Sequence, residues 1–188
     1  MTEITTERLF LRPWRADDLD ALSVMHADPE VMRYIGLGQP QNRAETAEAL
    51  RRYREHWAVH GFGLWAVEVR ATGRMIGRIG LSYQEGWEHV ELGWLLDRTV
   101  WGRGLATEGA RAALRFGFER LGMDRIISLY HPDNTASLRV MEKLGMTYGG
   151  NRATNGTKGG VVFWSTITRT MWELPGGTSG AAPPLEET

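Results

Sequence analysis

Residues 91–114 read ELGWLLDRTVWGRGLATEGARAAL: a strand-like run, a turn with two glycines and the beginning of a helix. Gly102 and Gly104 are one residue apart and stand immediately before residues with helical spacing. Glycine lets the backbone come close to a ligand, and the first turn of a helix offers unpaired N–H groups and the positive end of the helix dipole. The stretch therefore predicts a strand–turn–helix unit whose turn can bind a phosphate group.

The residues around these glycines limit which phosphate-binding motif the turn can be. A nucleoside-triphosphate loop requires Gly-Lys-Ser or Gly-Lys-Thr, but Leu105 follows Gly104. A dinucleotide fingerprint needs a third small residue where Thr107 stands, and a strand that runs directly into the first glycine. The dinucleotide interpretation stays open, and so does an ordinary loop-to-helix connection that binds nothing.

The whole chain has the length and composition of one soluble domain. Its 188 residues are 42% hydrophobic and its formal net charge is -1, so no excess of positive charge attracts nucleic acid. The first residues lack the apolar segment of a signal peptide, and no later apolar run is long enough to cross a membrane. The absence of cysteine excludes disulfides and a cysteine acyl-enzyme, and the five histidines show no metal-ligand spacing. We expect a cytoplasmic protein with no metal, nucleic-acid or membrane partner.

Apolar periodicity before the quoted stretch predicts a strand, three helices and a meander. TERLFLRPW reads as a short strand, helical spacing covers residues 18–27, DPEVMRY restarts a short helix, and an amphipathic helix covers residues 43–60. Three strand-like runs follow, and their short connections fit antiparallel hairpins. The runs are FGLWAVEVR, RMIGRIGLSY and EHVELGWLLD.

After the glycine turn, a helix over residues 105–121 leads to the strand RIISLY. A strand, a helix and a second strand at this spacing predict a right-handed crossover, so RIISLY runs parallel to EHVELGWLLD. DNTASLRVMEKLG predicts a further helix that Asp133 or Asn134 caps, and the last strands are MTYGG and VVFWSTITRTMWE. The predicted fold class is α+β, with a mixed, mostly antiparallel sheet that contains one parallel strand pair and is flanked by helices.

Three stretches of the chain resemble the GNAT N-acetyltransferases, in particular the branch of ribosomal-protein N-terminal acetyltransferases. They are TERLFLRPW, ELGWLLDRTVWGRGLATEGARAAL and HPDNTASLRVMEKLGM, and their order and spacing are more specific than any one motif. The resemblance implies a GNAT domain over residues 1–174 in which the two parallel strands splay apart. It leaves residues 175–188 as a flexible tail.

The resemblance also implies that acetyl-CoA is the acetyl donor. The family's Gln/Arg-x-x-Gly-x-Gly/Ala turn corresponds to residues 101–106, where Trp101 departs from the usual Gln or Arg. Backbone amides of this turn and helix start bind the pyrophosphate in the family, and here they belong to Gly102, Arg103, Gly104, Leu105, Ala106 and Thr107.

Free backbone groups at the end of the splayed strand bind the pantetheine arm in the family, which implies this role for Trp94, Leu95 and Leu96. Trp94 and Leu96 also alternate like ordinary core residues. Three nearby arginines either meet phosphate groups or remain solvated surface charges: Arg98, Arg103 and Arg111.

Acetyl transfer to an amine requires a neutral nitrogen, an oriented carbonyl and a proton for the departing thiolate. The resemblance places the family's helix-start asparagine at Asn134 and makes Ser137 the proton donor, with a plain cap and a small serine as the alternative. Glu91 matches a glutamate that in some family members removes the amine proton through water. Glu88 and His131 are other candidate bases, and Glu91 could simply face solvent.

The resemblance implies acetyl transfer from acetyl-CoA to a primary amine. We expect a protein or peptide N-terminal α-amine, because its pKa near 8 leaves roughly a tenth neutral at pH 7, against well under a hundredth for lysine. A small-molecule amine is the alternative acceptor. A non-catalytic acyl-CoA-binding module and a dinucleotide oxidoreductase remain as other classes of function, and we expect a monomer or a homodimer.

Overall fold

The structure is a computed structural model and describes residues 2–83, 88–153 and 161–174. Its first half contains β1 (Ile4–Thr5), β2 (Leu9–Arg12), α1 (Asp18–Ala27), α2 (Pro29–Met32), α3 (Arg43–His60), β3 (Leu64–Val69), β4 (Arg74–Ser82) and β5 (Val90–Leu96). The second half contains η1 (Arg98–Val100), α4 (Leu105–Arg115), η2 (Phe116–Arg120), β6 (Arg125–Tyr130), α5 (Thr135–Lys143), β7 (Thr147–Ala153), β8 (Val161–Thr168) and α6 (Arg169–Glu173).

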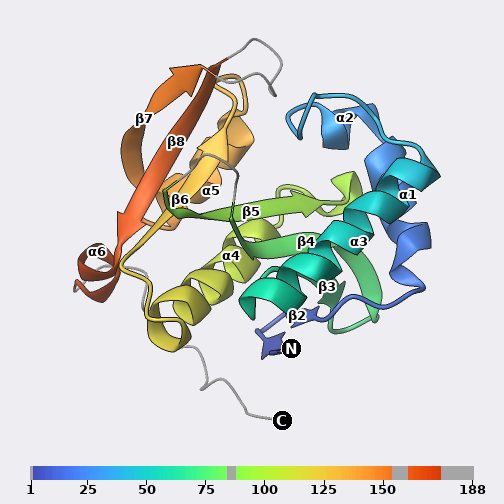
Figure 1. The fold of residues 1–188 in the computed structure, drawn as a ribbon, viewed down its shortest axis with the longest axis horizontal. Helices are drawn as coiled ribbons and strands as arrows, with labels where there is room; N and C mark the ends of the chain where they lie inside the picture. Colours follow the sequence, from blue (N-terminus) through green and yellow to red (C-terminus); the bar gives the residue numbers. More distant parts are fainter. Residues whose placement is uncertain (1, 84–87, 154–160, 175–188) are drawn as a thin grey trace.

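The strands form one sheet in the order β1-β2-β3-β4-β5-β6-β8-β7 (Figure 1). Neighbouring strands are antiparallel except for β5 and β6, which are parallel and connected through α4. The runs that were expected to form a meander are β3, β4 and β5, paired as two antiparallel hairpins. The predicted mixed sheet with a single parallel pair is therefore confirmed for the described residues.

β5 and β6 diverge soon after they pair. Val90 lies opposite Ile126 and Glu91 opposite Ile127, and the Ser128 hydroxyl then donates to the Leu92 carbonyl oxygen at 2.8 Å. Residues 93–96 stay paired with β4, while in the described part of the chain they have no pairing with β6. The carboxyl end of β5 is thus splayed away from β6, as the resemblance implied.

Helices cover both faces of the sheet. Gly109 of α4 packs so closely on β4 that a Cβ there would lie 2.5 Å from Ile79 Cδ1. The preceding residue, Arg78, places its guanidinium carbon 5.3 Å from the ring centre of Tyr53 in α3. Because consecutive strand residues point to opposite faces, α4 covers one face and α3, with α1 packed on it, covers the other.

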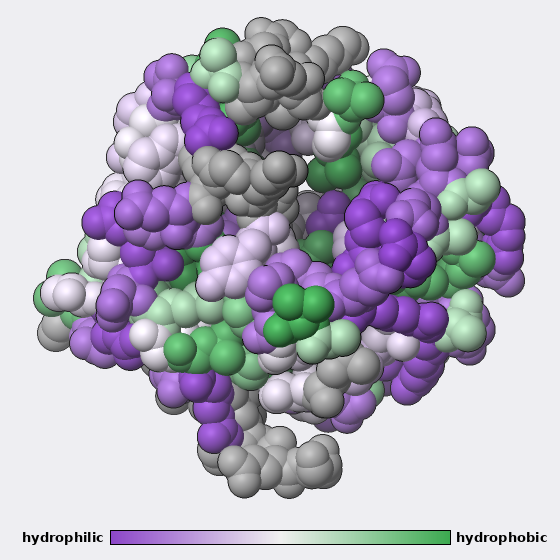
Figure 2. Space-filling view, viewed as in Figure 1, coloured by the Kyte–Doolittle hydropathy of each residue, from purple (hydrophilic) through white to green (hydrophobic). Residues whose placement is uncertain are grey.

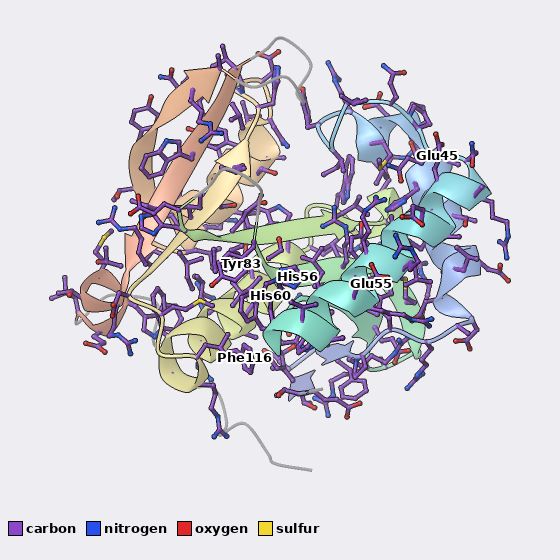
Figure 3. All side chains as sticks on the ribbon, viewed as in Figure 1. Glu45, Glu55, His56, His60, Tyr83 and Phe116 are labelled. Atoms are coloured by element: carbon purple, nitrogen blue, oxygen red, sulfur yellow. The ribbon has the colours of Figure 1, made fainter. Side chains whose placement is uncertain are left out.

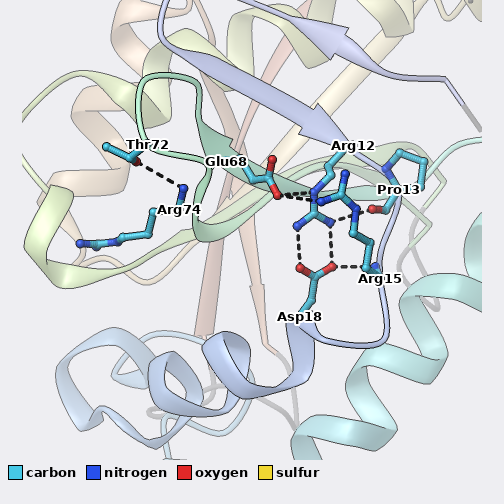
Figure 4. A network of polar contacts seen from close by, with 7 residues as sticks. All are labelled: Arg12, Pro13, Arg15, Asp18, Glu68, Thr72 and Arg74. Atoms are coloured by element: carbon cyan, nitrogen blue, oxygen red, sulfur yellow. Dashed lines mark hydrogen bonds and ion pairs between the residues drawn. The ribbon is translucent and has the colours of Figure 1, made fainter.

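A buried ion-pair network joins β2, α1 and β3 (Figure 4). Arg12 donates to the two carboxylate oxygens of Asp18 at 2.8 and 2.6 Å and to Glu68 Oε1 at 2.6 Å. The side chains of Arg12 and Asp18 are each 3% exposed. Burial alone would raise the pKa of Asp18, but hydrogen bonds from Arg12 and from the Arg15 backbone N–H lower it. The network fixes the beginning of α1 against the sheet.

Two helix boundaries differ from the sequence-based expectation. The helix expected over residues 105–121 ends as α4 at Arg115 and continues as a π-helical turn, η2, where Gly117 lies against Ile126 of β6 and Leu81 of β4. The final strand run stops at Thr168, because the Thr168 hydroxyl accepts from the Met171 backbone N–H at 3.3 Å and begins α6. The predicted tail, residues 175–188, lies outside the described residues.

Candidate active site

A cavity of about 480 Å³ opens between α2 on one side and α5 on the other, with the end of β5 and the beginning of α4 beneath it. The space-filling view shows the molecule hollowed between its α1–α3 side and its β6–β8 side (Figure 2). Most residues predicted for the site line this cavity: Trp94, Leu95, Leu96, Gly102, Gly104, Leu105, Ala106, Thr107, Asn134 and Ser137. Two predicted residues, Glu91 and Arg103, are not part of its lining.

The turn between β5 and α4 has the backbone that a phosphate cradle requires. Gly102 and Gly104 have φ values of +73° and +78°, which favour glycine, and α4 begins directly after them. In the described residues, the structure records no acceptor for the backbone N–H groups of residues 102–107. These free donors at a helix start can bind an anion.

Contacts from the amino-terminal strands fix this turn. Glu108, in the first turn of α4, accepts from the Thr6 hydroxyl at 2.6 Å and from Arg8 Nε at 2.6 Å. Burial alone would raise the pKa of Glu108, but these hydrogen bonds and one from the Arg8 backbone N–H lower it. Arg8 also donates to the Arg103 carbonyl oxygen at 2.9 Å. The turn is therefore held in place by residues almost a hundred positions away.

The three arginines considered as phosphate ligands have different surroundings. Arg98 forms an ion pair with Asp28 at 3.3 Å, and Arg111 donates to the Lys143 carbonyl oxygen at 3.0 Å. Neither residue lines the cavity. Arg103 is exposed and contributes its backbone to the turn.

Trp101, the departure from the family turn, attaches the turn to β5. Its indole N–H donates to the Leu96 carbonyl oxygen at 2.8 Å, and the residue is 48% exposed. The indole therefore covers the last carbonyl of the splayed strand, while the backbone before it remains available to a ligand.

Asn134 and Ser137 form the first turn of the opposite wall. Asn134 is the N-cap of α5, and its Oδ1 accepts from the Ser137 backbone N–H at 3.2 Å. Of the two caps that the sequence left open, the structure selects Asn134. Both side chains line the cavity, so their predicted proximity is present.

Glu91 lies on the sheet face covered by α1 and α3, opposite Ser82 of β4. A Cβ built on Gly93, two residues further, would meet within 4 Å only the Glu91 carboxylate, at 3.9 Å. Among the described residues, no other side chain therefore lies close to Gly93 on this face of β5. Glu91 and Gly93 thus lie on the face of the splayed strand that is opposite α4.

A group of rings lies at the same end of β4, where α3 ends (Figure 3). The His60 ring is 4.4 Å from that of His56 and 4.9 Å from that of Tyr83. His56 Nε2 accepts from the Tyr83 backbone N–H at 3.0 Å, so its proton is assigned to Nδ1, which is 2.9 Å from the Phe62 carbonyl oxygen. Burial lowers the pKa of His56. The ring is therefore neutral and links the end of α3 to β4.

Sequence reasoning did not identify the residues that close the cavity. The Tyr34 ring stacks on His131 with centroids 5.3 Å apart and joins the α2 side to the α5 side. Arg139 and Lys143 also line the cavity. Their i, i+4 spacing on one helix was the signal available in the sequence.

Two further observations concern metals and membranes. Among residues 2–83, 88–153 and 161–174, no three His, Asp or Glu side chains gather as they would around a metal ion. Within the same ranges, no helix is both long and apolar enough to span a bilayer.

Comparison with known proteins identifies the family. Residues 8–147 match the model of the acetyltransferase (GNAT) domain. The Bacillus subtilis (strain 168) protein YkkB is 34% identical over 151 residues, which cover 78% of this chain and 86% of YkkB. The FsC-acetyl coenzyme A-N(2)-transacetylase of Aspergillus fumigatus is 30% identical over 157 residues, covering 76% of this chain and 64% of that protein.

A solved structure agrees with this assignment. The GNAT-family acetyltransferase from Bacillus anthracis superposes with a TM-score of 0.78 at 26% identity, covering 90% of this chain and 99% of that one. The chain belongs to the GNAT acetyltransferase family, and it is an acetyl-CoA-dependent N-acetyltransferase.

Proposed function

We propose that this protein transfers the acetyl group of acetyl-CoA directly to the N-terminal α-amine of a protein or peptide, in a ternary complex. The observation that carries the proposal is that one cavity is lined by the glycine turn, the splayed end of β5 and the Asn134–Ser137 turn. These three elements offer what a coenzyme thioester requires: anion donors, a free strand edge and a hydroxyl near the sulfur.

The described residues fit acetyl-CoA, whose thioester supplies the acetyl group when it is bound. The free amides of residues 102–107 would hold the pyrophosphate. The backbone of Trp94 and the N–H of Leu96, which face away from β4, would pair with the pantetheine amides, whereas the backbone groups of Leu95 face β4. The cavity volume of about 480 Å³ is in the ordinary range for ligand sites.

We assign the proton transfers to two side chains. The Ser137 hydroxyl would donate its proton to the departing sulfur, since it lies beside Asn134 on the cavity wall. Glu91 would accept the amine proton through a water, since its carboxylate lies beside Gly93 on the face of β5 opposite α4. Donor and acceptor would thus meet at the splay from opposite faces of the sheet.

An α-amine suits this arrangement better than a lysine side chain. A carboxylate such as Glu91 is a weak base, and an α-amine with pKa near 8 is roughly a tenth neutral at pH 7 without help. A lysine amine with pKa near 10.4 would need a much stronger base.

A small-molecule amine is the second candidate acceptor. The relative from Aspergillus fumigatus supports it, because its name, FsC-acetyl coenzyme A-N(2)-transacetylase, specifies a nitrogen numbered N(2) and no protein amino terminus. That likeness extends over 76% of this chain.

Acetyl-CoA turnover against an acceptor panel tests the proposal. The panel contains peptides with a free amino end and an internal lysine, the same peptides with a blocked amino end, polyamines and free amino acids. We expect turnover with the free peptides alone, and mass mapping should place the acetyl group on the α-nitrogen. Exclusive lysine acetylation, or activity on small amines only, would contradict the assigned acceptor.

A further inference from the structure

Arg78 is a partly buried arginine without an acidic partner, on the sheet face covered by α1 and α3. Its guanidinium carbon lies 5.3 Å from the centre of the Tyr53 ring. Its Nε is buried and has no hydrogen-bond partner. Across the part of the chain that the structure describes, no ion pair or hydrogen bond is recorded for any nitrogen of this side chain.

Near Arg78 lie the buried side chain of His26 and the half-buried side chain of Gln41. His26 is 1% exposed, and among the described residues neither its ring nitrogens nor Gln41 Oε1 form a hydrogen bond of good geometry, although the Gln41 side chain is near enough to the ring to raise the pKa of His26 a little. The Gln41 backbone N–H donates to the His26 carbonyl oxygen at 2.8 Å and fixes the α2–α3 connection over α1. The pKa of His26 falls to about 4, first through burial and then through the charge of Arg78. A neutral imidazole ring cannot compensate the positive charge of the Arg78 guanidinium.

A buried cation without a counter-charge is unfavourable, so folded proteins pair such groups or use them on a ligand. The guanidinium fork matches a carboxylate in geometry, and it can donate two parallel hydrogen bonds to it. The group therefore suits an anionic oxygen ligand.

The position of Arg78 relates it to the acceptor. In the register of β4 and β5, Arg78 lies opposite Leu95, which lines the cavity. The next pair on this face is Gly80 with Gly93, and the pair after that contains the proposed base Glu91. Four residues of strand, from Leu95 to Glu91, span roughly 13 Å. An amine beside Glu91 would extend over the glycine pair toward Arg78.

We infer that Arg78 is a specificity-determining residue that binds a carboxylate of the acceptor, several bonds from the reacting amine. This inference rests on the proposed function and narrows the acceptor to an amine that carries an acidic group. The carboxylate belongs either to an acidic side chain of a peptide or to a small amino acid.

Two matched acceptor pairs distinguish these sources. One pair is a C-terminally amidated peptide with a free amino end and aspartate at its third position, against its asparagine counterpart; the other is 6-aminohexanoate against hexylamine. We expect wild-type kcat/KM to favour the acidic member of one pair by about 10- to 100-fold, as a charge-assisted hydrogen bond would. Arg78→Met should abolish the preference and leave the neutral members unchanged. Arg78→Lys should restore part of it.

Two further readouts separate recognition from a structural role. Because Arg78 has no ion pair, Arg78→Met should unfold at or above the wild-type temperature, and its acetyl-CoA dissociation constant should be unchanged. Calorimetric titration of the acidic members into the CoA-loaded protein should show the same preference without catalysis.

A preference in the peptide pair supports an acidic peptide and agrees with the proposed acceptor. A preference in the other pair supports a small amino acid and contradicts the proposed acceptor, while the role of Arg78 stands. Equal kcat/KM and equal affinity within both pairs, or a preference that survives in Arg78→Met, would overturn the inference. If Arg78→Met also lowered kcat/KM for the neutral acceptors, or weakened acetyl-CoA binding, to the same extent, the inference would be overturned too. Arg78-dependent binding of the acid with no acetylation of any amine would support the inference and contradict the proposed function.

Discussion

At the scale of single residues, Asn134 and Ser137 lie within one turn of α5 but have different tasks in the proposed reaction. Asn134 Oδ1 is occupied by the Ser137 backbone N–H at 3.2 Å, so this side chain already caps the helix. The Ser137 side chain lines the cavity and takes no part in that cap. Removing the two groups should therefore change different kinetic and binding constants.

Ser137→Ala should lower kcat by about 10²- to 10⁴-fold, the usual effect of losing a general acid, and leave the acetyl-CoA dissociation constant unchanged. Asn134→Ala should weaken acetyl-CoA binding as well and should cost about 1 kcal/mol of stability through the lost cap. Steady-state kinetics, with dissociation constants measured separately, checks both variants. A wild-type kcat in Ser137→Ala, where chemistry limits the rate, would remove Ser137 from the mechanism.

The site residues that sequence reasoning found are mostly neighbours along the chain. Asn134 and Ser137 were proposed through the family resemblance, and their proximity could be predicted because one helical turn joins them. Arg78, His26 and Gln41 come from β4, α1 and the α2–α3 connection. Nothing in their local sequence indicates that they meet, because long-range packing alone brings them together.

At the scale of elements, the turn between β5 and α4 is a rigid unit. Its glycines have the left-handed conformation, and Glu108 ties the first turn of α4 to Thr6 and Arg8. The turn therefore presents its amides without first having to order itself. A change at one glycine should affect the cofactor more than the fold.

Gly104→Val should weaken acetyl-CoA binding strongly, because a branched side chain would stand where the pyrophosphate approaches the backbone. Gly73→Val is the matched control: Gly73 has φ +65°, has nothing within 4 Å of a built Cβ and does not line the cavity. Both variants should lose about 1–2 kcal/mol of stability through backbone strain. Calorimetric titration and thermal unfolding provide the comparison, and equal acetyl-CoA affinities in the two folded variants would refute the cradle.

The elements with local signals were predictable, and those set by tertiary contact were not. The β3–β4 and β4–β5 hairpins follow from short connections, and α3 begins with the capping box of Asn42 and Glu45. The π turn after α4 depends instead on the close approach of Gly117 to Ile126. Helical spacing alone cannot reveal such a contact.

At the scale of the whole molecule, buried His26 makes stability depend on pH. Its pKa is about 4 in the folded protein and near 6.5 when unfolded. The unfolded chain therefore binds more protons between these values, and acidification from pH 7 to pH 5 should lower the free energy of unfolding by about 2 kcal/mol. Denaturant unfolding at several pH values measures this loss.

His26→Leu is the control for this pH dependence. The variant should lose most of the change between pH 7 and pH 5, and the lowered pKa of His56 should leave a smaller slope in the same direction. Asp18 and Glu108 have lowered pKa values, so their stabilisation should disappear only at more acidic pH, in both proteins. An unchanged slope in His26→Leu would show that other groups cause the pH effect.

The splay of β5 from β6 also has a mechanical consequence. Among the described residues, the sheet is continuous from β1 to β7. Two residue pairs join β5 to β6, as few as join the short edge strand β1 to β2 and fewer than join any other neighbouring strands. Interstrand hydrogen bonds share a pulling load in proportion to their number, so a force applied across the sheet concentrates on this junction. The opening proposed for the coenzyme is thus also the line along which the two halves of the sheet, β1–β5 and β6–β7, would separate under load.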